Sequence, residues 1–179
     1  LASLSTTLAT NALVEGQGGR VGLIYIGFDV RDLETHGLKD ALNGNPVIIL
    51  SGGHDHSGTE VASLDTEALR DWLSQDQGVS AFAVAAQFAT RNPIHEQRVV
   101  KMITQITCRP VSASHHLSSK LNGPKRALTA LLNARLIGLT HKLIGRAENI
   151  LQEIGITAPL LVVRGDGALI SSAMAKERP

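Results

Sequence analysis

The sequence of 179 residues contains a single cysteine, Cys108, so an internal disulfide is impossible and an oxidising compartment is not required. An excess of one charge is also missing, because 17 Lys and Arg stand against 16 Asp and Glu, a formal net charge of +1. Proteins that coat a nucleic-acid backbone need a clustered basic surface. The charge balance therefore argues against a nucleic-acid partner.

Long hydrophobic runs are absent as well. No apolar stretch of the sequence reaches the roughly 20 residues of a membrane span. The first residues lack the basic stretch and apolar core of a signal peptide. With 43% hydrophobic and 18% charged residues, the composition indicates a globular domain with a sizeable core, not a disordered chain. We therefore expect a cytoplasmic protein with no membrane partner.

Three motifs of self-contained active sites do not occur. The sequence has no Gly-x-Gly-x-x-Gly, no Gly-x-x-x-x-Gly-Lys-[Ser/Thr] and no Gly-x-Ser-x-Gly. Cys108 stands at an expected helix–strand junction with no marked partner for nucleophilic chemistry. The sequence alone therefore identifies no catalytic residue.

Hydrophobic periodicity predicts alternating strands and helices. Short apolar runs predict strands at 21–28, 47–50, 79–88, 110–114 and 159–163. Helical spacing predicts helices at 32–42, 66–75, 93–106 and 124–153, with Asp65 as the N-cap of the second. This order is typical of an α/β sheet with mostly parallel neighbours. The composition turns strongly helical near 122–124, where two subdomains could meet.

The loop 52–58 gathers His54, Asp55 and His56, which are metal-ligand types. Neighbouring loop positions rarely converge on one ion, and no distant third ligand is marked. A turn, in which Asp55 and Ser57 bond backbone groups and the glycines take positive φ, is the favoured interpretation. We predict no metal site in this loop.

Other polar residues stand near expected strand ends or within the long helix. They are Thr6, Thr7 and Asn11, the pair His115 and His116, Asn133, and Asp166. Ends of parallel strands are where open α/β sheets bind ligands. Each set also has an ordinary explanation, since hydroxyl and amide groups cap helices and glycine-flanked aspartates form turns. The residues alone leave both interpretations open.

Five stretches together resemble the hydantoinase A/oxoprolinase family. They are Thr6-Thr7-Leu8-Ala9-Thr10-Asn11-Ala12-Leu13, Asn92-Pro93-Ile94-His95-Glu96, Ser114-His115, Thr129-Ala130-Leu131-Leu132-Asn133-Ala134, and the run from Pro159 through Gly167-Ala168-Leu169-Ile170-Ser171. These stretches follow the family's order and span nearly the whole chain.

The resemblance implies a lobe fragment of an actin-like ATPase (ribonuclease H-like) fold, with a mixed sheet, flanking helices and one long helix. It also implies two parts, residues 1–122 from the N-terminal lobe and residues 123–179 from the start of the following hydantoinase A domain. Members are ATP-dependent hydrolases of cyclic amides such as hydantoins and 5-oxoproline, and some relatives carboxylate ketones. The implied cofactors are ATP and Mg²⁺, and the implied partners are the rest of the A-type polypeptide and a B-type subunit.

The family's phosphate-binding loops, of the type Asp-x-Gly-Gly-Thr, do not occur in this sequence. We therefore expect a central segment that hydrolyses nothing alone, with the main ATP-binding loops elsewhere. The resemblance implies that Thr6, Thr7, Asn11, Asn133 and Asp166 bind substrate or nucleotide. The competing hypothesis is a non-catalytic interaction module, in which the histidine loop and the long helix serve an interface. A metallohydrolase using His54, Asp55 and His56 is a third, less favoured hypothesis.

Overall fold

The computed structural model describes residues 2–5, 19–163 and 167–177. The described strands are β1 (Ala2–Ser5), β2 (Val21–Ile26), β3 (Val47–Leu50), β4 (Ala81–Ala86), β5 (Val111–Ala113), β6 (Leu160–Val163) and β7 (Leu169–Ser171). The described helices are η1 (Val30–Glu34), α2 (Leu38–Leu42), α3 (Thr66–Ser74), α4 (Ile94–Thr107), α5 (Ser114–Leu117), α6 (Gly123–Glu153) and α7 (Ser172–Glu177). Internal contacts divide the chain into a central unit, residues 20–134, and a terminal unit, residues 1–19 with 135–179.

The central unit contains a four-stranded sheet in the order β3-β2-β4-β5, and all neighbours are parallel. Every residue of β2 and of β4 is buried. Strands of a parallel sheet are covered on both faces and therefore read as continuous apolar runs. The sequence prediction of parallel α/β structure is confirmed here.

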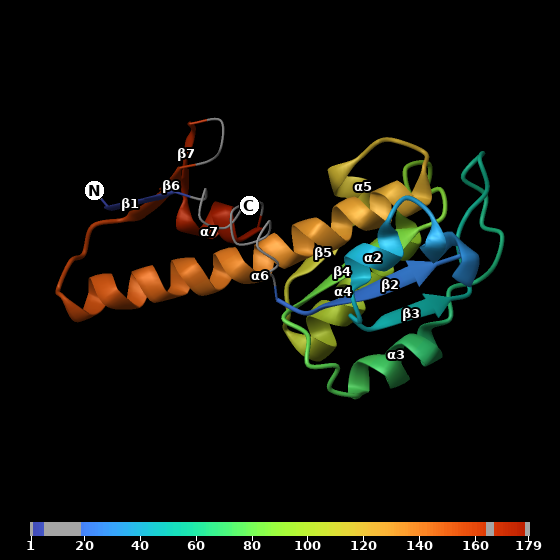
Figure 1. The fold of residues 1–179 in the computed structure, drawn as a ribbon, viewed down its shortest axis with the longest axis horizontal. Coiled ribbons are helices and arrows are strands. Elements are labelled where there is room, and N and C mark those ends of the chain that lie inside the picture. The colour runs from blue at the N-terminus through green and yellow to red at the C-terminus, as the bar shows by residue number, and fades with distance from the viewer. Residues whose placement is uncertain (1, 6–18, 164–166, 178–179) are drawn as a thin grey trace. The chain divides into compact units, whose positions relative to one another are not determined.

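Alternate side chains of β2 and β4 supply two separate cores. On one face, Ile24 and Val84 pack with residues of α3 and α4, including Leu69 and Val99. On the other face, Leu23 and Ala83 pack with α2 and the first turns of α6. The buried residues that these two helices supply are Leu38, Leu42, Ala127, Ala130, Leu131 and Ala134. Figure 1 shows the resulting layers, with α3 on one side of the strands and α2 on the other.

Local sequence signals predicted most of the helix ends correctly. The side chain of Asp65 accepts a hydrogen bond from the backbone N–H of Ala68 and caps α3, as predicted. The long helix and the helix after Pro93 also lie within a residue of their predicted bounds. The single helix predicted at 32–42 is wrong. The chain forms η1 and α2 instead, because His36 and Gly37 both take positive φ and interrupt the helix.

The terminal unit contains a second, three-stranded sheet in the order β1-β6-β7. β1 runs parallel to β6, with Ser5 opposite Val163, and β7 is antiparallel to β6. Its small core joins Ile144 of α6, Val162 of β6 and Ala175 of α7. The sequence did not predict this second sheet, because β6 pairs with a strand from the opposite end of the sequence. Periodicity within a segment carries no information on such a partner.

Candidate functional site

The four parallel strands of the central unit end at one edge of the sheet, after Ile26, Leu50, Ala86 and Ala113. The chain passes from β2 to β3 on one side and then crosses to β4 on the other side. Neighbouring strands whose connections leave in opposite directions define the usual ligand crevice of an open α/β sheet. The residues after β2 and β4 therefore border the expected ligand crevice.

The loop after β3 closes over this position. The backbone N–H of His54 donates to the Gln87 carbonyl, which follows β4, at 3.2 Å. Gly27, which follows β2, has φ +76, and a Cβ there would lie 2.6 Å from the Gly52 carbonyl oxygen. Backbone approaches this close require glycine. The crevice between β2 and β4 is therefore covered by the chain itself.

The histidine loop is a turn, as predicted. One Asp55 carboxylate oxygen accepts hydrogen bonds from the Ser57 N–H and hydroxyl and from the Thr59 N–H. These bonds, the one from the Ser57 hydroxyl first, hold the pKa of Asp55 below its ordinary value. His56 is exposed, whereas His54 is only 1% exposed. The two imidazoles therefore lie in different environments. Among the described residues, no group of three side chains could hold a metal ion.

His95, at the start of α4, has a partner on each ring nitrogen. Its Nδ1 accepts from the Gly53 N–H at 2.9 Å, so the ring hydrogen of the neutral form lies on Nε2. Nε2 then donates to Glu60 at 2.9 Å. The His54 ring packs against His95 with centroids 4.5 Å apart. Burial first, and then the neighbouring His95, lower the pKa of His54, so His54 is held in its neutral form.

Glu96 is the centre of a second group, which we call the Glu96 cluster: Glu96, Ser114, His115 and Arg126. The carboxylate is fully buried and receives four donors. One oxygen accepts from the Ala86 N–H at 2.8 Å and the Ser114 hydroxyl at 2.6 Å. The other accepts from the His115 N–H at 3.0 Å and from His115 Nδ1 at 2.6 Å. So many donors stabilise an ionised carboxylate in a buried position.

Arg126 ties the start of α6 to the same cluster. Its guanidinium donates to the Ala86 carbonyl at 2.7 Å, to the Ser114 hydroxyl at 3.3 Å, and to the carbonyls of Lys120 and Leu121. Only 1% of Arg126 is exposed. Burial lowers its pKa, while the charge of Glu96 acts in the opposite direction. The two buried charges thus hold the end of β4, the end of β5 and the start of α6 together.

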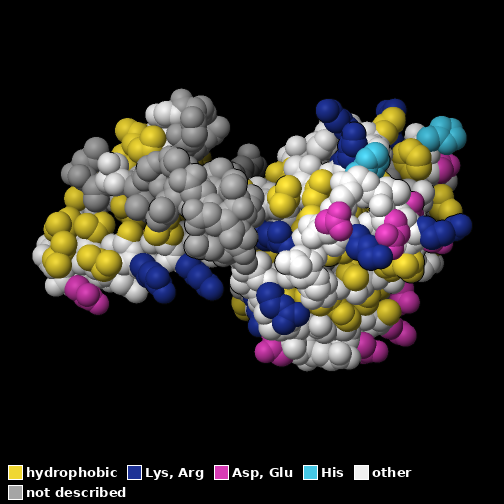
Figure 2. Space-filling view, in the orientation of Figure 1, with side chains coloured by type: hydrophobic (Ala, Val, Ile, Leu, Met, Phe, Trp, Pro, Cys, Tyr) yellow, Lys and Arg dark blue, Asp and Glu magenta, His cyan; other side chains and the backbone are white. Residues whose placement is uncertain are grey.

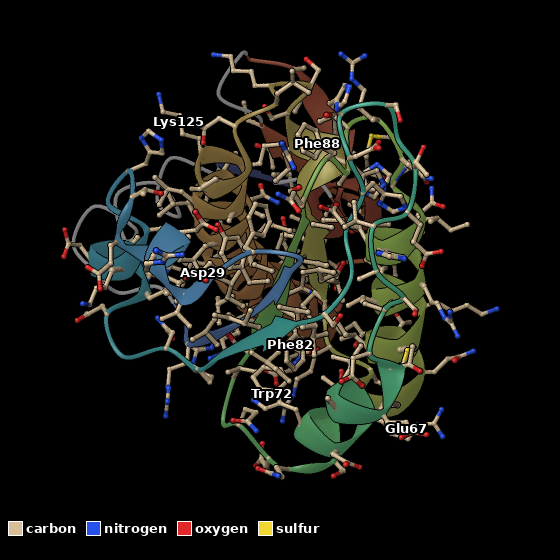
Figure 3. The ribbon with its side chains drawn as sticks, turned by 90° about the vertical axis from the view of Figure 1, so that its right-hand side faces the viewer. Asp29, Glu67, Trp72, Phe82, Phe88 and Lys125 are labelled. Carbon is tan, nitrogen blue, oxygen red and sulfur yellow. The ribbon has the colours of Figure 1, made fainter. Side chains whose placement is uncertain are left out.

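The turn between β4 and α4 is strained. Phe88 has φ +51, which is a rare conformation for a bulky residue. Its carbonyl accepts from the N–H groups of Arg91 and Asn92, and these bonds stabilise the turn. Figure 3 shows Phe88 at the opposite end of the sheet from Phe82 and Trp72, whose rings meet edge to face. The strain therefore lies at the carboxyl edge, beside the polar clusters.

Of the five residues expected to bind substrate or nucleotide, four lie outside the described residues. These are Thr6, Thr7, Asn11 and Asp166. The described strands that precede them, β1 and β6, are parallel neighbours, with Ser5 opposite Val163. Asn133 is half-buried, and its side-chain amide donates to the Ser112 hydroxyl at 3.0 Å. This bond satisfies part of the hydrogen-bonding capacity of Asn133 within the central unit.

The residues that the sequence interpretation missed are Glu96 and Arg126. Glu96 belongs to the Asn92-Pro93-Ile94-His95-Glu96 stretch, which served only as a mark of family resemblance. Both are charged residues within an apolar helix pattern, and this pattern could have indicated them, because a buried charge needs partners. The His115–His116 pair, by contrast, was singled out, and the structure places His115 against Glu96.

No helix among the described residues combines the length and the hydrophobicity that a membrane crossing needs. A separate cleft of about 480 Å³ lies in the terminal unit, lined by residues that include Leu151, Ile156 and Leu160. It lies at the amino end of β6, whereas Val163 is at the carboxyl end of that strand. The cleft is therefore distinct from the edge at which ligand-binding residues were expected.

Comparison with known proteins shows several relatives. The chain is 26% identical to the caprolactamase subunit alpha of Pseudomonas jessenii, over 97% of this chain and 27% of that protein. It is 29% identical to the acetophenone carboxylase gamma subunit of Aromatoleum aromaticum, over 91% of this chain and 26% of that protein. It is 26% identical to 5-oxoprolinase 1 of Arabidopsis thaliana, over 93% of this chain and 16% of that protein.

The crystal structure of the ATP-dependent caprolactamase from Pseudomonas jessenii has the same fold over 92% of this chain and 26% of that one, with a TM-score of 0.73 and 25% identity. The chain thus spans about a quarter or less of the length of these relatives. Residues 1–107 match the hydantoinase/oxoprolinase N-terminal region, which is more than half of the chain. The chain belongs to the hydantoinase/oxoprolinase family.

Proposed function

We propose that this chain is part of an ATP-dependent cyclic-amide hydrolase of the hydantoinase/5-oxoprolinase type. The observation that carries the proposal is the similarity to the ATP-dependent caprolactamase, which extends along nearly the whole chain in both sequence and fold. The relationship to 5-oxoprolinase 1 supports the same class of substrate. The enclosing fold is proposed to be an actin-like ATPase, with residues 1–122 in its N-terminal lobe and residues 123–179 beginning the following hydantoinase A domain.

ATP would supply activation in the proposed reaction, because an amide is a poor electrophile. Its carbonyl oxygen is a poor leaving group until it is phosphorylated, after which it can depart as phosphate. The described residues do not fit an ATP–Mg²⁺ site by themselves. They include no group of three metal-binding side chains, and the sequence has no Gly-x-x-x-x-Gly-Lys-[Ser/Thr] loop. We therefore assign the phosphate and Mg²⁺ contacts to residues outside the described part, and we expect the 179-residue chain alone to be inactive.

The proposed role of Thr6, Thr7, Asn11 and Asp166 is to form hydrogen bonds to the ring amide or to the nucleotide. The parallel pairing of β1 with β6 supports this role, because Ser5 and Val163 are opposite one another just before these segments. Residues that follow neighbouring parallel strands at their carboxyl ends are well placed for ligands. Asn133 is proposed as a further contact, using the capacity that its bond to Ser112 leaves.

The test is an activity assay on the complete cytoplasmic protein together with its B-type subunit, the proposed partner. We expect ATP-dependent ring opening of at least one of hydantoin, 5-oxoproline and caprolactam, with release of ADP. Thr7→Val should raise KM for the amide or for ATP roughly 5- to 150-fold, the effect of losing a ligand hydrogen bond worth about 1–3 kcal/mol. Thr104→Val, on the exposed side of α4, is the matched control. Absence of ATP-dependent turnover with all three amides would refute the proposal.

A second candidate function, a non-catalytic interaction module, is favoured by one observation. Ile150, Ile154 and Ile156 in the terminal unit are 56%, 61% and 43% exposed. Figure 2 shows hydrophobic side chains gathered over the C-terminal end of α6. Exposed apolar groups of this kind mark interaction surfaces. Under this alternative, Ile154→Glu should abolish co-purification of the B-type subunit, and no wild-type preparation should open a cyclic amide.

A further inference from the structure

His54, His95 and His115, near the carboxyl edge of the central sheet, differ in their hydrogen-bond partners. His95 uses both ring nitrogens, as described above. His54 uses neither, but its ring packs against His95 and is almost fully buried. His115 uses one nitrogen and keeps about 10% of its side chain exposed. Of the three, only His115 combines a fixed orientation with an unused nitrogen.

The tautomer of His115 follows from its partner. Nδ1 lies 2.6 Å from Glu96 Oε2, and an ionised carboxylate can only accept hydrogen bonds. Nδ1 therefore carries the ring hydrogen. The backbone N–H of His115 donates to the same oxygen at 3.0 Å, so the residue is held at two points. In the neutral ring, Nε2 is left with a lone pair and no hydrogen.

The surrounding groups do not satisfy that lone pair. Glu96 accepts four hydrogen bonds and has no hydrogen to donate, and the guanidinium of Arg126 donates to Ser114, Ala86, Lys120 and Leu121. Nε2 of His115 is buried and has no hydrogen-bond partner in the described part of the chain. Buried acceptors are normally paired. Nε2 is therefore the acceptor of the Glu96 cluster that the described residues leave without a partner.

We propose that His115 Nε2 accepts a hydrogen bond from the ring N–H of the cyclic amide, a proposal that rests on the function proposed above. The position suits a ligand, because His115 follows β5 at the carboxyl edge of a parallel sheet. A lone pair beside the Glu96 carboxylate disfavours an anion. A divalent ion would need further ligands, and the described residues supply no group of three. A neutral N–H or O–H donor remains, and the cyclic amide of the proposed function supplies an N–H.

The first test uses His115→Asn in the complete protein with its B-type subunit. The asparagine side-chain amide keeps a donor toward Glu96 and removes the acceptor at Nε2. We expect KM for the cyclic amide to rise tenfold or more, where tenfold corresponds to about 1.4 kcal/mol, while KM for ATP stays unchanged. His56→Asn makes the same chemical change at an exposed loop position and should leave both values unchanged. An unchanged amide KM in a folded His115→Asn protein refutes the proposal and leaves the proposed function intact.

A second test distinguishes a lost hydrogen bond from a general disturbance of the site. N-methylcaprolactam lacks the N–H donor, so wild type and His115→Asn should bind it equally well. Caprolactam itself should bind the wild type at least tenfold more tightly than the variant. An equal loss for both amides means that the substitution disturbs the site without removing a specific bond, and the proposal fails.

A third measurement needs no variant and no turnover. In wild-type protein labelled with ¹⁵N-histidine, caprolactam should shift the Nε2 resonance of His115 and leave Nδ1 nearly unchanged. An Nε2 resonance that does not move at saturating caprolactam overturns the proposal. A shift in a protein that turns over no cyclic amide supports the binding site and refutes only the proposed function.

Discussion

The two units of the chain use parallel strands in different ways. In the central unit, the polar groups beyond the strand ends bind one another, through Asp55, His95, Glu96 and Arg126. In the terminal unit, β1 and β6 are also parallel neighbours, but the core is small and several large apolar side chains are exposed. A polar motif at a strand end is therefore not in itself a ligand site. A ligand site has to be sought among the atoms that the internal hydrogen bonds leave without a partner, and His115 Nε2 is the one proposed here.

The largest loss of stability is expected from a substitution that breaks the Glu96 cluster. Glu96→Gln replaces one acceptor oxygen by an N–H₂ group that faces donors, and it removes the charge that offsets buried Arg126. Removing one partner of a buried charged network costs about 3–5 kcal/mol. We expect the free energy of unfolding, measured by urea denaturation with an unchanged m-value, to fall by this amount.

The matched control for this change is Glu67→Gln, at an exposed position in the first turn of α3. It makes the same chemical change and removes only a favourable interaction with the helix dipole, worth about 0.3–1 kcal/mol. A Glu96→Gln protein as stable as Glu67→Gln would show that the central unit does not depend on its buried charges. The contrast between the two units would then lose its physical basis.

A smaller effect comes from the close backbone approach at the same edge. Gly27 and Gly155 have nearly the same φ, +76 and +74, but a Cβ at Gly27 meets the Gly52 carbonyl and one at Gly155 meets nothing within 4 Å. Left-handed backbone costs a non-glycine residue about 1–2 kcal/mol, and overpacking adds about 1–3 kcal/mol. Gly27→Ala should therefore lower the free energy of unfolding by about 2–5 kcal/mol, and Gly155→Ala by only about 1–2 kcal/mol, as measured by denaturation. Equal losses would mean that the loop after β3 does not press on β2.

Because His54 is buried, we expect the stability of the central unit to depend on pH. Its pKa is lowered in the folded chain from 6.5, mainly by burial and then by His95, with partial compensation by Glu60 and Asp55. Below pH 6.5 the unfolded chain binds a proton that the folded chain does not, so stability falls as pH falls. The free energy of unfolding should fall by up to about 1.4 kcal/mol for each pH unit below 6.5.

This dependence is measured as the difference in urea midpoints between pH 7.0 and pH 5.5. His54→Leu should flatten the difference, whereas His56→Gln, at an exposed position, should leave it as in the wild type. A profile that His54→Leu does not change would assign the acid sensitivity to other groups.

Local sequence signals predicted most of the elements. The break at His36 and Gly37 is a local error, whereas the missed strand pairing and the missed polar cluster depend on contacts distant in sequence. The Asp65 cap and the long helix depend on neighbours within a few positions, which the sequence displays directly. The pairing of β1 with β6 joins segments more than 150 positions apart, and no local pattern encodes it. The Glu96 cluster likewise needs α4, β5 and α6 to be placed before its hydrogen bonds can be seen.

The histidine loop shows the same rule at one site. Asp55, Ser57 and Thr59 are close in sequence, and their turn was predicted correctly. The burial of His54 against His95 joins positions on different elements, and it was not predicted. Residue types therefore indicated which groups are polar, whereas the three-dimensional contacts decided which of them remain open.

The smallest expected effect on stability concerns Asn133, where structural and ligand-binding roles can be separated. Asn133→Ala removes the bond to Ser112, worth about 0.5–1.5 kcal/mol, but alanine improves helix propensity by up to about 0.7 kcal/mol. The net loss of stability should therefore be less than about 1 kcal/mol. Asn149→Ala, at an exposed position of the same helix in the terminal unit, gains propensity alone and is the matched control. If Asn133 also binds a ligand, its alanine variant in the complete protein raises KM or lowers kcat although it remains folded. Kinetics identical to those of Asn149→Ala would limit Asn133 to holding α6 against β5.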